Sequence, residues 1–149
     1  MTTMPIHWTV SHATRSVVIT ATGTIRFADM QECVRAIAMP ATLSYRKLVD
    51  LGQAELTFGR NGVIALSKYI REHRGTGPMG ALALVVGSDA LEQQARQFKS
   101  MEIEDRPLKI FRDASAARAW LDTQPSPLRP AWLERDEETA LPTFLEERP

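Results

Sequence analysis

The stretches Lys47–Leu51 (KLVDL) and Ala81–Gly87 (ALALVVG) decide the fold of this chain. Both are short, mainly apolar runs, a pattern typical of strands that are covered on both faces. An amphipathic helical stretch precedes the first run, another lies between the two runs, and a third follows the second. Because helical crossovers join parallel neighbouring strands, this order predicts a single α/β domain with a mixed, partly parallel sheet and both runs at its centre.

Three further strands bring the predicted sheet to about five. Residues 7–10 and 17–22 are rich in β-branched residues, so they predict an antiparallel hairpin whose second strand ends at Gly23. Residues 107–112 alternate in polarity and predict the last strand.

Four helices are predicted to pack on this sheet. The first has Met30, Val34 and Ile37 on one face, where Cys33 is interpreted as a small core residue. The second extends from about residue 58 to 73. Asp89 is predicted to cap the third helix, with Glu92 completing a capping box, and Asp113 the fourth.

The composition limits the possible classes of function. The chain has 149 residues, enough for one domain with a sizeable core, and 18 basic and 18 acidic residues give a net charge of zero. A neutral chain has no overall electrostatic attraction to nucleic acid, so we expect none as a partner. The first residues resemble no signal peptide, and no apolar stretch has membrane-spanning length. We therefore expect a cytoplasmic protein.

The neutral total conceals an asymmetry between body and tail. Residues 1–122 carry 15 basic and 12 acidic residues, whereas residues 123–149 carry 3 basic and 6 acidic residues. Proline and serine at residues 125–127 mark the boundary of this acidic, proline-containing extension. Its apolar residues predict that it packs on the body of its own chain or of a neighbour in a homo-oligomer, with Trp132 and Leu133 as anchors.

No cluster of residues specifies a reaction, a metal site or a cofactor. Residues 75–80 match the pattern G-x-G-x-x-G, but they follow a helix and precede a strand, the reverse of a dinucleotide-binding loop. The three histidines lack metal-ligand spacing. Asp50 is interpreted as a strand-end cap or as the acceptor of a turn hydrogen bond. We therefore expect no cofactor and no metal, and we consider a non-enzymatic role the better hypothesis while leaving an enzyme open.

The second helix carries the strongest surface signal. Arg60, Lys68, Arg71 and Arg74 lie towards one side of it, with Ile64 between them. Such a stripe is either a solvated face or a binding surface, and the acidic tail supplies charges of the opposite sign.

The order of elements and several short motifs resemble the STAS-like group, the fold of bacterial anti-anti-sigma factors. The motifs are Thr22–Ile25 (TGTI), Leu48–Leu51 (LVDL), Ala83–Gly87 (ALVVG) and Ala116–Leu121 (AARAWL). The last one is similar to the uncharacterised variant of the group whose final helix ends in small residues followed by Trp-Leu. This resemblance covers about residues 6–122 and implies a STAS-like domain followed by a C-terminal extension.

The resemblance also implies where the function lies. Group members are switched by phosphorylation of a serine at the start of the helix after the Asp-Leu strand. Here residues 55–60 contain no serine, and Thr57 is the nearest hydroxyl, with Arg60 close by. The resemblance therefore implies a regulatory or protein-binding module that acts through residues 56–74.

The alternative is a carrier or sensor of a small apolar or anionic ligand, held between that helix and the tail. A binding module should show an exposed apolar patch beside Arg60 and Ile64, whereas a carrier should show an enclosed pocket there.

Overall fold

The computed structural model describes residues 5–37, 42–73, 79–101 and 106–124. Its strands are β1 (Ile6–Ser11), β2 (Ser16–Ile25), β3 (Arg46–Leu56), β4 (Leu82–Val86) and β5 (Leu108–Phe111). Its helices are α1 (Phe27–Ile37), α2 (Arg60–His73), α3 (Asp89–Ser100) and α4 (Ala114–Asp122). Strands and helices alternate after the first hairpin, as in other α/β domains.

The five strands form one sheet in the order β1-β2-β3-β4-β5. β1 pairs with β2 in the antiparallel sense, and the remaining neighbours pair in parallel. The two apolar runs of the sequence fall in β3 and β4, which both have neighbours on either side. Within the described residues, the prediction of an α/β fold with a mixed sheet of five strands and four helices is confirmed.

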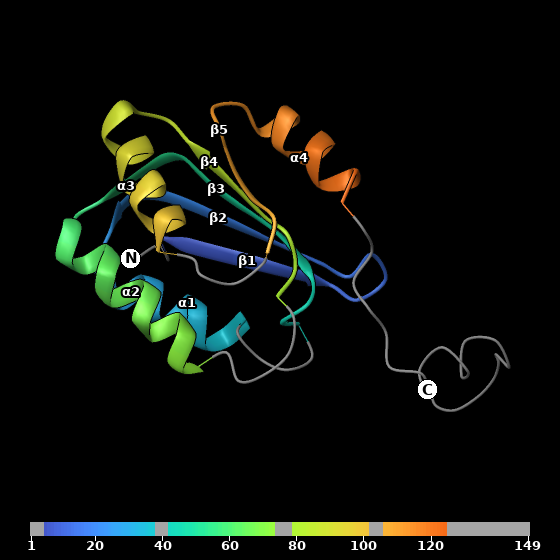
Figure 1. The fold of residues 1–149 in the computed structure, drawn as a ribbon, viewed down its shortest axis with the longest axis horizontal. Coiled ribbons are helices and arrows are strands. Elements are labelled where there is room, and N and C mark those ends of the chain that lie inside the picture. Colours follow the sequence, from blue (N-terminus) through green and yellow to red (C-terminus); the bar gives the residue numbers. More distant parts are fainter. Residues whose placement is uncertain (1–4, 38–41, 74–78, 102–105, 125–149) are drawn as a thin grey trace, which may run out of the picture.

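The sheet separates two layers of helices. Each of α1, α2 and α3 connects a strand to the next parallel strand in the same direction across the sheet, so right-handed crossovers place all three on one face. α4 follows the last strand and packs on the opposite face, against β3, β4 and β5 (Figure 1). The molecule thus has one face under three helices and another under a single helix.

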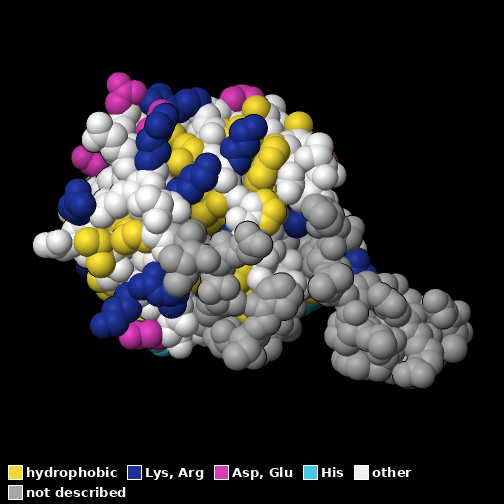
Figure 2. Space-filling model, viewed as in Figure 1, with side chains coloured by type: hydrophobic (Ala, Val, Ile, Leu, Met, Phe, Trp, Pro, Cys, Tyr) yellow, Lys and Arg dark blue, Asp and Glu magenta, His cyan; other side chains and the backbone are white. Residues whose placement is uncertain are grey.

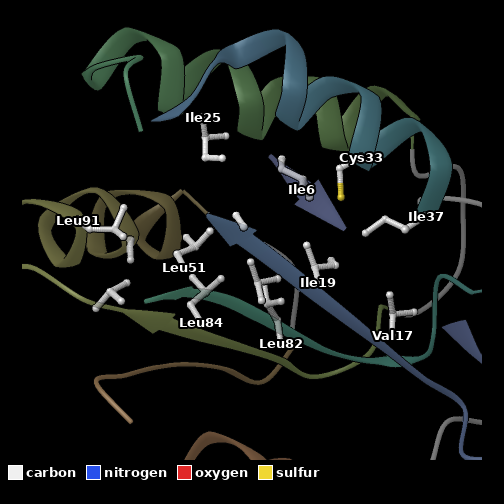
Figure 3. Packing of buried hydrophobic residues seen from close by; sticks show 14 of the residues in the cluster. Ile6, Val17, Ile19, Ile25, Cys33, Ile37, Leu51, Leu82, Leu84 and Leu91 are labelled. Carbon is white, nitrogen blue, oxygen red and sulfur yellow. The ribbon is translucent and has the colours of Figure 1, made fainter. Parts of the chain in front are cut away.

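The larger core lies on the three-helix face. There β2 alternates, so that Val17, Ile19 and Ala21 are buried in the same core cluster as Cys33 of α1 and Leu91 of α3 (Figure 3). Each large side chain buried in this way stabilises the fold by about 1.5–3 kcal/mol. Cys33 is 2 % exposed, which confirms its interpretation as a core residue. The smaller core, between the sheet and α4, includes Ala83 and Ala117, both fully buried.

Two strands are longer than expected. β2 continues past Gly23 to Ile25, because Gly23 adopts φ = 76°, a left-handed conformation that glycine tolerates without ending the pairing. β3 continues past Leu51 to Leu56, through a register shift opposite Thr20 and Thr22 of β2. The carboxylate Oδ1 of Asp50 accepts a hydrogen bond from the backbone N–H of Gly52 at 2.9 Å within this irregularity. The expected turn-type hydrogen bond of Asp50 is therefore present, inside a strand.

The start of α3 also differs from the prediction. Ser88, and not Asp89, is the N-cap, since Ser88 has extended backbone (φ −148°) and its Oγ accepts a hydrogen bond from the N–H of Leu91 at 3.1 Å. Asp89 is the first helical residue, and its carboxylate pairs with Arg112. By contrast, Asp113 caps α4 as predicted, because its Oδ2 accepts from the N–H of Ala116 at 2.8 Å.

Some predictions fall beyond the described part of the chain. They concern Arg74 of the basic stripe and the tail anchors Trp132 and Leu133. Within the described part, no helix combines the length and the hydropathy needed to cross a bilayer.

Candidate functional site

The exposed face of α2 brings together four of the predicted binding residues. At about 100° per residue, Arg60, Ile64, Lys68 and Arg71 lie within a sector of about 80°. All four are exposed. Among the described residues, Ile64 is the only large hydrophobic residue that is exposed, with 43 % of its surface accessible. Figure 2 shows Lys and Arg side chains beside hydrophobic ones at the lower left, the side where α2 lies in Figure 1. We call these four residues the α2 surface.

The turn before α2 is tied to the sheet by Thr57. This residue is exposed and lies three positions before the first residue of α2. Its backbone N–H donates to the carbonyl oxygen of Ile25 at 3.0 Å, and its Oγ1 donates to the same oxygen at 3.1 Å. Thr57 therefore joins the end of β3 to the end of β2, next to the α2 surface.

Two glutamines of α3 hold the start of α2 in place. The side-chain Nε2 of Gln94 donates to the carbonyl oxygen of Phe58 at 3.0 Å, and that of Gln97 donates to the carbonyl oxygen of Arg60 at 3.0 Å. Phe58 also packs edge-on against Phe27 of α1, with ring centroids 5.7 Å apart. The beginning of α2 is thus fixed by α1 and α3.

An open crevice of about 730 Å³ lies between the end of β3 and the first residues of α2 and α3. Its walls include Glu55, Arg60, Ser88 and the glutamines of α3. Open α/β sheets bind ligands most often outside the carboxyl ends of their strands, which is where this crevice lies. The walls combine polar side chains such as Gln93 with apolar surface from Ala54 and Leu56.

A buried lysine occupies the other end of β3. Lys47 is only 5 % exposed, and its Nζ donates to the backbone carbonyl oxygens of Thr42, Leu43 and Tyr45 at 2.9, 3.0 and 3.0 Å. All three acceptors are neutral groups. No carboxylate among the described residues forms a hydrogen bond or ion pair with this ammonium group.

Gly80 allows the loop that holds Lys47 to lie against β4. The N–H of Gly80 donates to the carbonyl oxygen of Leu43 at 3.2 Å. A Cβ atom on Gly80 would lie 2.2 Å from the carbonyl oxygen of Tyr45, so no larger residue fits here without movement of the backbone. Arg106 closes the other side, since its Nε donates to the carbonyl oxygen of Gly80 at 3.0 Å.

Lys47 lines a cavity that is otherwise almost entirely apolar. This cavity, of about 130 Å³, lies between the sheet and the three helices, on the side of α2 opposite to the α2 surface. Its walls include Ile19, Cys33, Leu66 and Leu84, and Arg106 lies beside Lys47 in its lining. Gln94 is the other polar side chain in the lining. A largely apolar cavity and a cationic group thus occur together.

Burial changes the acidity of two side chains in the cavity wall, Lys47 and Cys33. Removal from water, and to a smaller extent the positive charge of Arg106, lowers the pKa of the Lys47 ammonium group from 10.5 to about 7. Burial raises the pKa of the Cys33 thiol to about 12, so this thiol stays protonated and unreactive. Near neutral pH, Lys47 therefore exchanges between the charged and neutral forms.

The binding-module and ligand-carrier hypotheses predict different features near Arg60 and Ile64. In the structure, the exposed apolar side chain and the cavity lie on opposite sides of α2. The exposed side chain of Ile64 lies one helical turn from Arg60, but among the described residues it is a single large apolar side chain and not the apolar patch expected for a binding module. The apolar cavity does not include Arg60 or Ile64, because it is lined by the opposite side of α2, at Val63, Leu66 and Ile70.

Lys47 and Arg106 were not singled out from the sequence. Lys47 was noted only as the first residue of an apolar run. Its position in the strand could have indicated its burial. Side chains alternate along a strand, so Lys47 lies on the same face as Val49 and Leu51, which are buried. A lysine at an inward position of a buried strand is uncommon, and it indicates a specific environment. Nothing comparable in the sequence marks Arg106.

Comparison with known proteins supports the fold. No protein-family model matches the chain, and no curated protein matches it. Among solved structures, an uncharacterized protein of the DUF3478 family with a SpoIIAA-like fold, from Shewanella loihica PV-4, is 12 % identical with a TM-score of 0.53, covering 81 % of this chain and 97 % of its own. The anti-sigma factor antagonist SpoIIAA in its unphosphorylated form is 10 % identical, with a TM-score of 0.48. The match covers 79 % of this chain and 98 % of the SpoIIAA chain. The chain is therefore similar to the first of these in its SpoIIAA-like architecture, in agreement with the STAS-like fold expected from the sequence.

Proposed function

We propose that the chain is a non-enzymatic regulatory or protein-binding module that acts through the turn before α2 and the α2 surface. The observation that carries this proposal is the exposure of Ile64 between Arg60, Lys68 and Arg71 on one helix face. An apolar side chain surrounded by cations is a common composition for the centre and rim of a docking surface.

The chemistry of this surface defines the partner. An apolar side chain of the partner covers Ile64, and acidic side chains lie against the surrounding cations. Burial of Ile64 provides most of the binding free energy, about 1.5–3 kcal/mol, whereas each exposed ion pair adds about 0–1 kcal/mol and mainly sets orientation. The partner is therefore a protein segment with acidic residues around an apolar one.

The rigidity of the helix start supports the same proposal. Gln94 and Gln97 hold the carbonyl groups of Phe58 and Arg60, so the first turn of α2 has little freedom to lose on binding. A preorganised surface binds more tightly than a mobile one that presents the same groups. Arg60 is thus displayed from a fixed backbone.

We further propose that Thr57 regulates this surface. Phosphorylation of its Oγ1 would break the hydrogen bond to the carbonyl oxygen of Ile25 and add negative charge three residues from Arg60. An acidic partner would then be repelled. Incubation with kinases from the native cell, followed by mass spectrometry, tests this step, and phosphate found only at other residues would exclude Thr57 as the switch.

The docking proposal is tested with two surface variants. The full chain captures its partner from an extract of the native cell, and the captured protein is purified and titrated against wild type, Ile64→Asp and Lys68→Glu. We expect the affinity to fall about tenfold or more for Ile64→Asp and a few-fold for Lys68→Glu. Arg118→Glu serves as the control, because Arg118 is exposed on α4, across the sheet from α2.

Equal affinity of all four proteins for the captured partner would contradict the proposal. A loss confined to Arg118→Glu would move the docking surface to the α4 face. Circular dichroism of each variant checks that the helices are retained, so that a loss of affinity is attributed to the surface itself.

A carrier or sensor of a small ligand is the second candidate function. The apolar cavity beside Lys47 is the specific observation that favours it. This function uses the inner side of α2, so it is compatible with docking on the outer side.

A further inference from the structure

The cavity between the sheet and α1, α2 and α3 combines two properties that a well-packed core lacks. It leaves about 130 Å³ unfilled, and it contains the side chain of a lysine. Protein interiors are close-packed, and voids larger than a water molecule are few in each domain. A buried lysine is normally paired with an acid. Each property by itself lowers the stability of the fold, so their coincidence calls for an explanation by function.

The size of the cavity limits what can enter it. An engineered apolar cavity of about 150 Å³ binds benzene, so a space of this volume accommodates an apolar body of about six carbon atoms. Among the described residues of the walls, the polar side chains are those of Lys47, Gln94 and Arg106. Water would find few partners along the rest of the wall. The occupant is thus a small molecule with a largely hydrocarbon body.

The charge at one end of the cavity defines the head group. The three carbonyl oxygens around the Nζ atom of Lys47 satisfy its N–H groups without neutralising its charge. No Asp or Glu occurs among the described residues that line the cavity. A carboxylate that replaces one of these carbonyl acceptors forms a charge-assisted hydrogen bond, which is shorter and about twice as strong as a neutral one. An acid therefore gains more here than an alcohol or an amide of the same shape.

We propose that this cavity binds a small monocarboxylic acid, with its hydrocarbon body between the sheet and the helices and its carboxylate against the ammonium group of Lys47. This site lies on the inner side of α2 and does not depend on docking at Ile64. Binding of the acid would compensate the buried charge and fill the void at the same time.

The experiment uses hexanoate as the probe and 1-hexanol as its neutral counterpart of the same length. Methyl signals of Ile19, Val49 and Leu84 in the full chain are followed by NMR at pH 6 during titration with each compound. We expect both to shift these signals, with hexanoate bound about tenfold more tightly than hexanol. This comparison needs no variant, so it holds even where a substitution in the core prevents folding.

The pH dependence of the same ratio identifies the group responsible. The titratable side chains of the described cavity wall are Lys47, Arg106 and Cys33, and the last two keep their protonation state between pH 6 and 9. Hexanoate stays ionised over this range. The preference for hexanoate should therefore decline from about tenfold at pH 6 to one or below at pH 9, because Lys47 loses its proton and the buried carboxylate loses its charged partner.

A pair of variants provides the matched control. Lys47→Met should remove the preference at pH 6 while hexanol still binds, and Lys99→Met, at an exposed position of α3, should keep it. Equal affinity for both compounds at pH 6 in the wild-type chain would overturn the proposal of an acid ligand. If neither probe shifts the cavity methyl signals at about 20 mM, any dissociation constant is weaker than this concentration. That result would overturn the proposal that the cavity is a binding site. Shifts by hexanoate confined to the α2 surface would also overturn it.

Discussion

The two ends of β3 present opposite environments. At the carboxyl end, Thr57 and the start of α2 are exposed, and an open crevice lies beside them. At the amino end, Lys47 is enclosed by three carbonyl groups, Gly80 and an apolar cavity. The comparison teaches that one strand can have two different surroundings, a water-exposed end where charges are screened and a largely apolar end where a single charge has a large effect.

The largest effect is expected at Gly80. In Gly80→Ala the new Cβ would lie 2.2 Å from the carbonyl oxygen of Tyr45 and 2.4 Å from that of Ser44, both backbone atoms that cannot rotate away. We expect the free energy of unfolding to fall by about 3 kcal/mol or more, measured by urea denaturation. Gly59→Ala, near the other end of β3, is the control, since nothing lies within 4 Å of its Cβ, and it should cost less than about 1 kcal/mol. Equal effects would show that the two ends of β3 are packed alike.

The next effect concerns the charge on Lys47. Its folded-state pKa of about 7 lies below the unfolded value of 10.5, so between these values the unfolded chain holds the additional proton. The contribution of Lys47 to stability is thus fully present above pH 10.5 and is lost as the pH falls through 7. Relative to Lys47→Met, the wild-type free energy of unfolding should rise by about 2 kcal/mol between pH 7 and 9. The same difference for Lys99→Met should stay constant, and a constant difference for Lys47→Met would mean that Lys47 does not titrate in this range.

The smallest effect is expected at Thr57, at the exposed end. Thr57→Val removes the Oγ1 hydrogen bond to the carbonyl oxygen of Ile25, which also accepts from the N–H of Thr57 and so keeps one donor. Thermal or urea unfolding should show a loss of about 0.5–1 kcal/mol. Thr24→Val, an exposed threonine of β2, should show no loss. A loss at Thr57 as large as that at Gly80 would make the turn a main support of the fold, contrary to the contrast between the two ends.

The elements of the fold were predictable because their signals are local. Apolar runs such as Ala81–Gly87 are long enough to specify a strand. In α2, the helical period alone predicts that Val63 and Leu66 lie on the buried side. The N-cap of α3 was misplaced by one residue because Ser88 and Asp89 are both good caps, and the choice depends on which of them is extended. The full length of β3 was missed because Gly52, Ala54 and Glu55 have low strand propensity, and this part of the strand pairs with β2.

The sequence by itself determined where the five strands lie along the chain, though not their full lengths, and that Arg60, Ile64, Lys68 and Arg71 share one face of α2. Both follow from the fixed periods of strands and helices. Only the tertiary structure decided what surrounds Lys47. The carbonyl groups that bind Lys47 are close to it in the chain, but Gly80 and Arg106, which enclose the same loop, come from distant segments. Burial and charge at one point depend on all of these neighbours together, and no local period in the sequence records them.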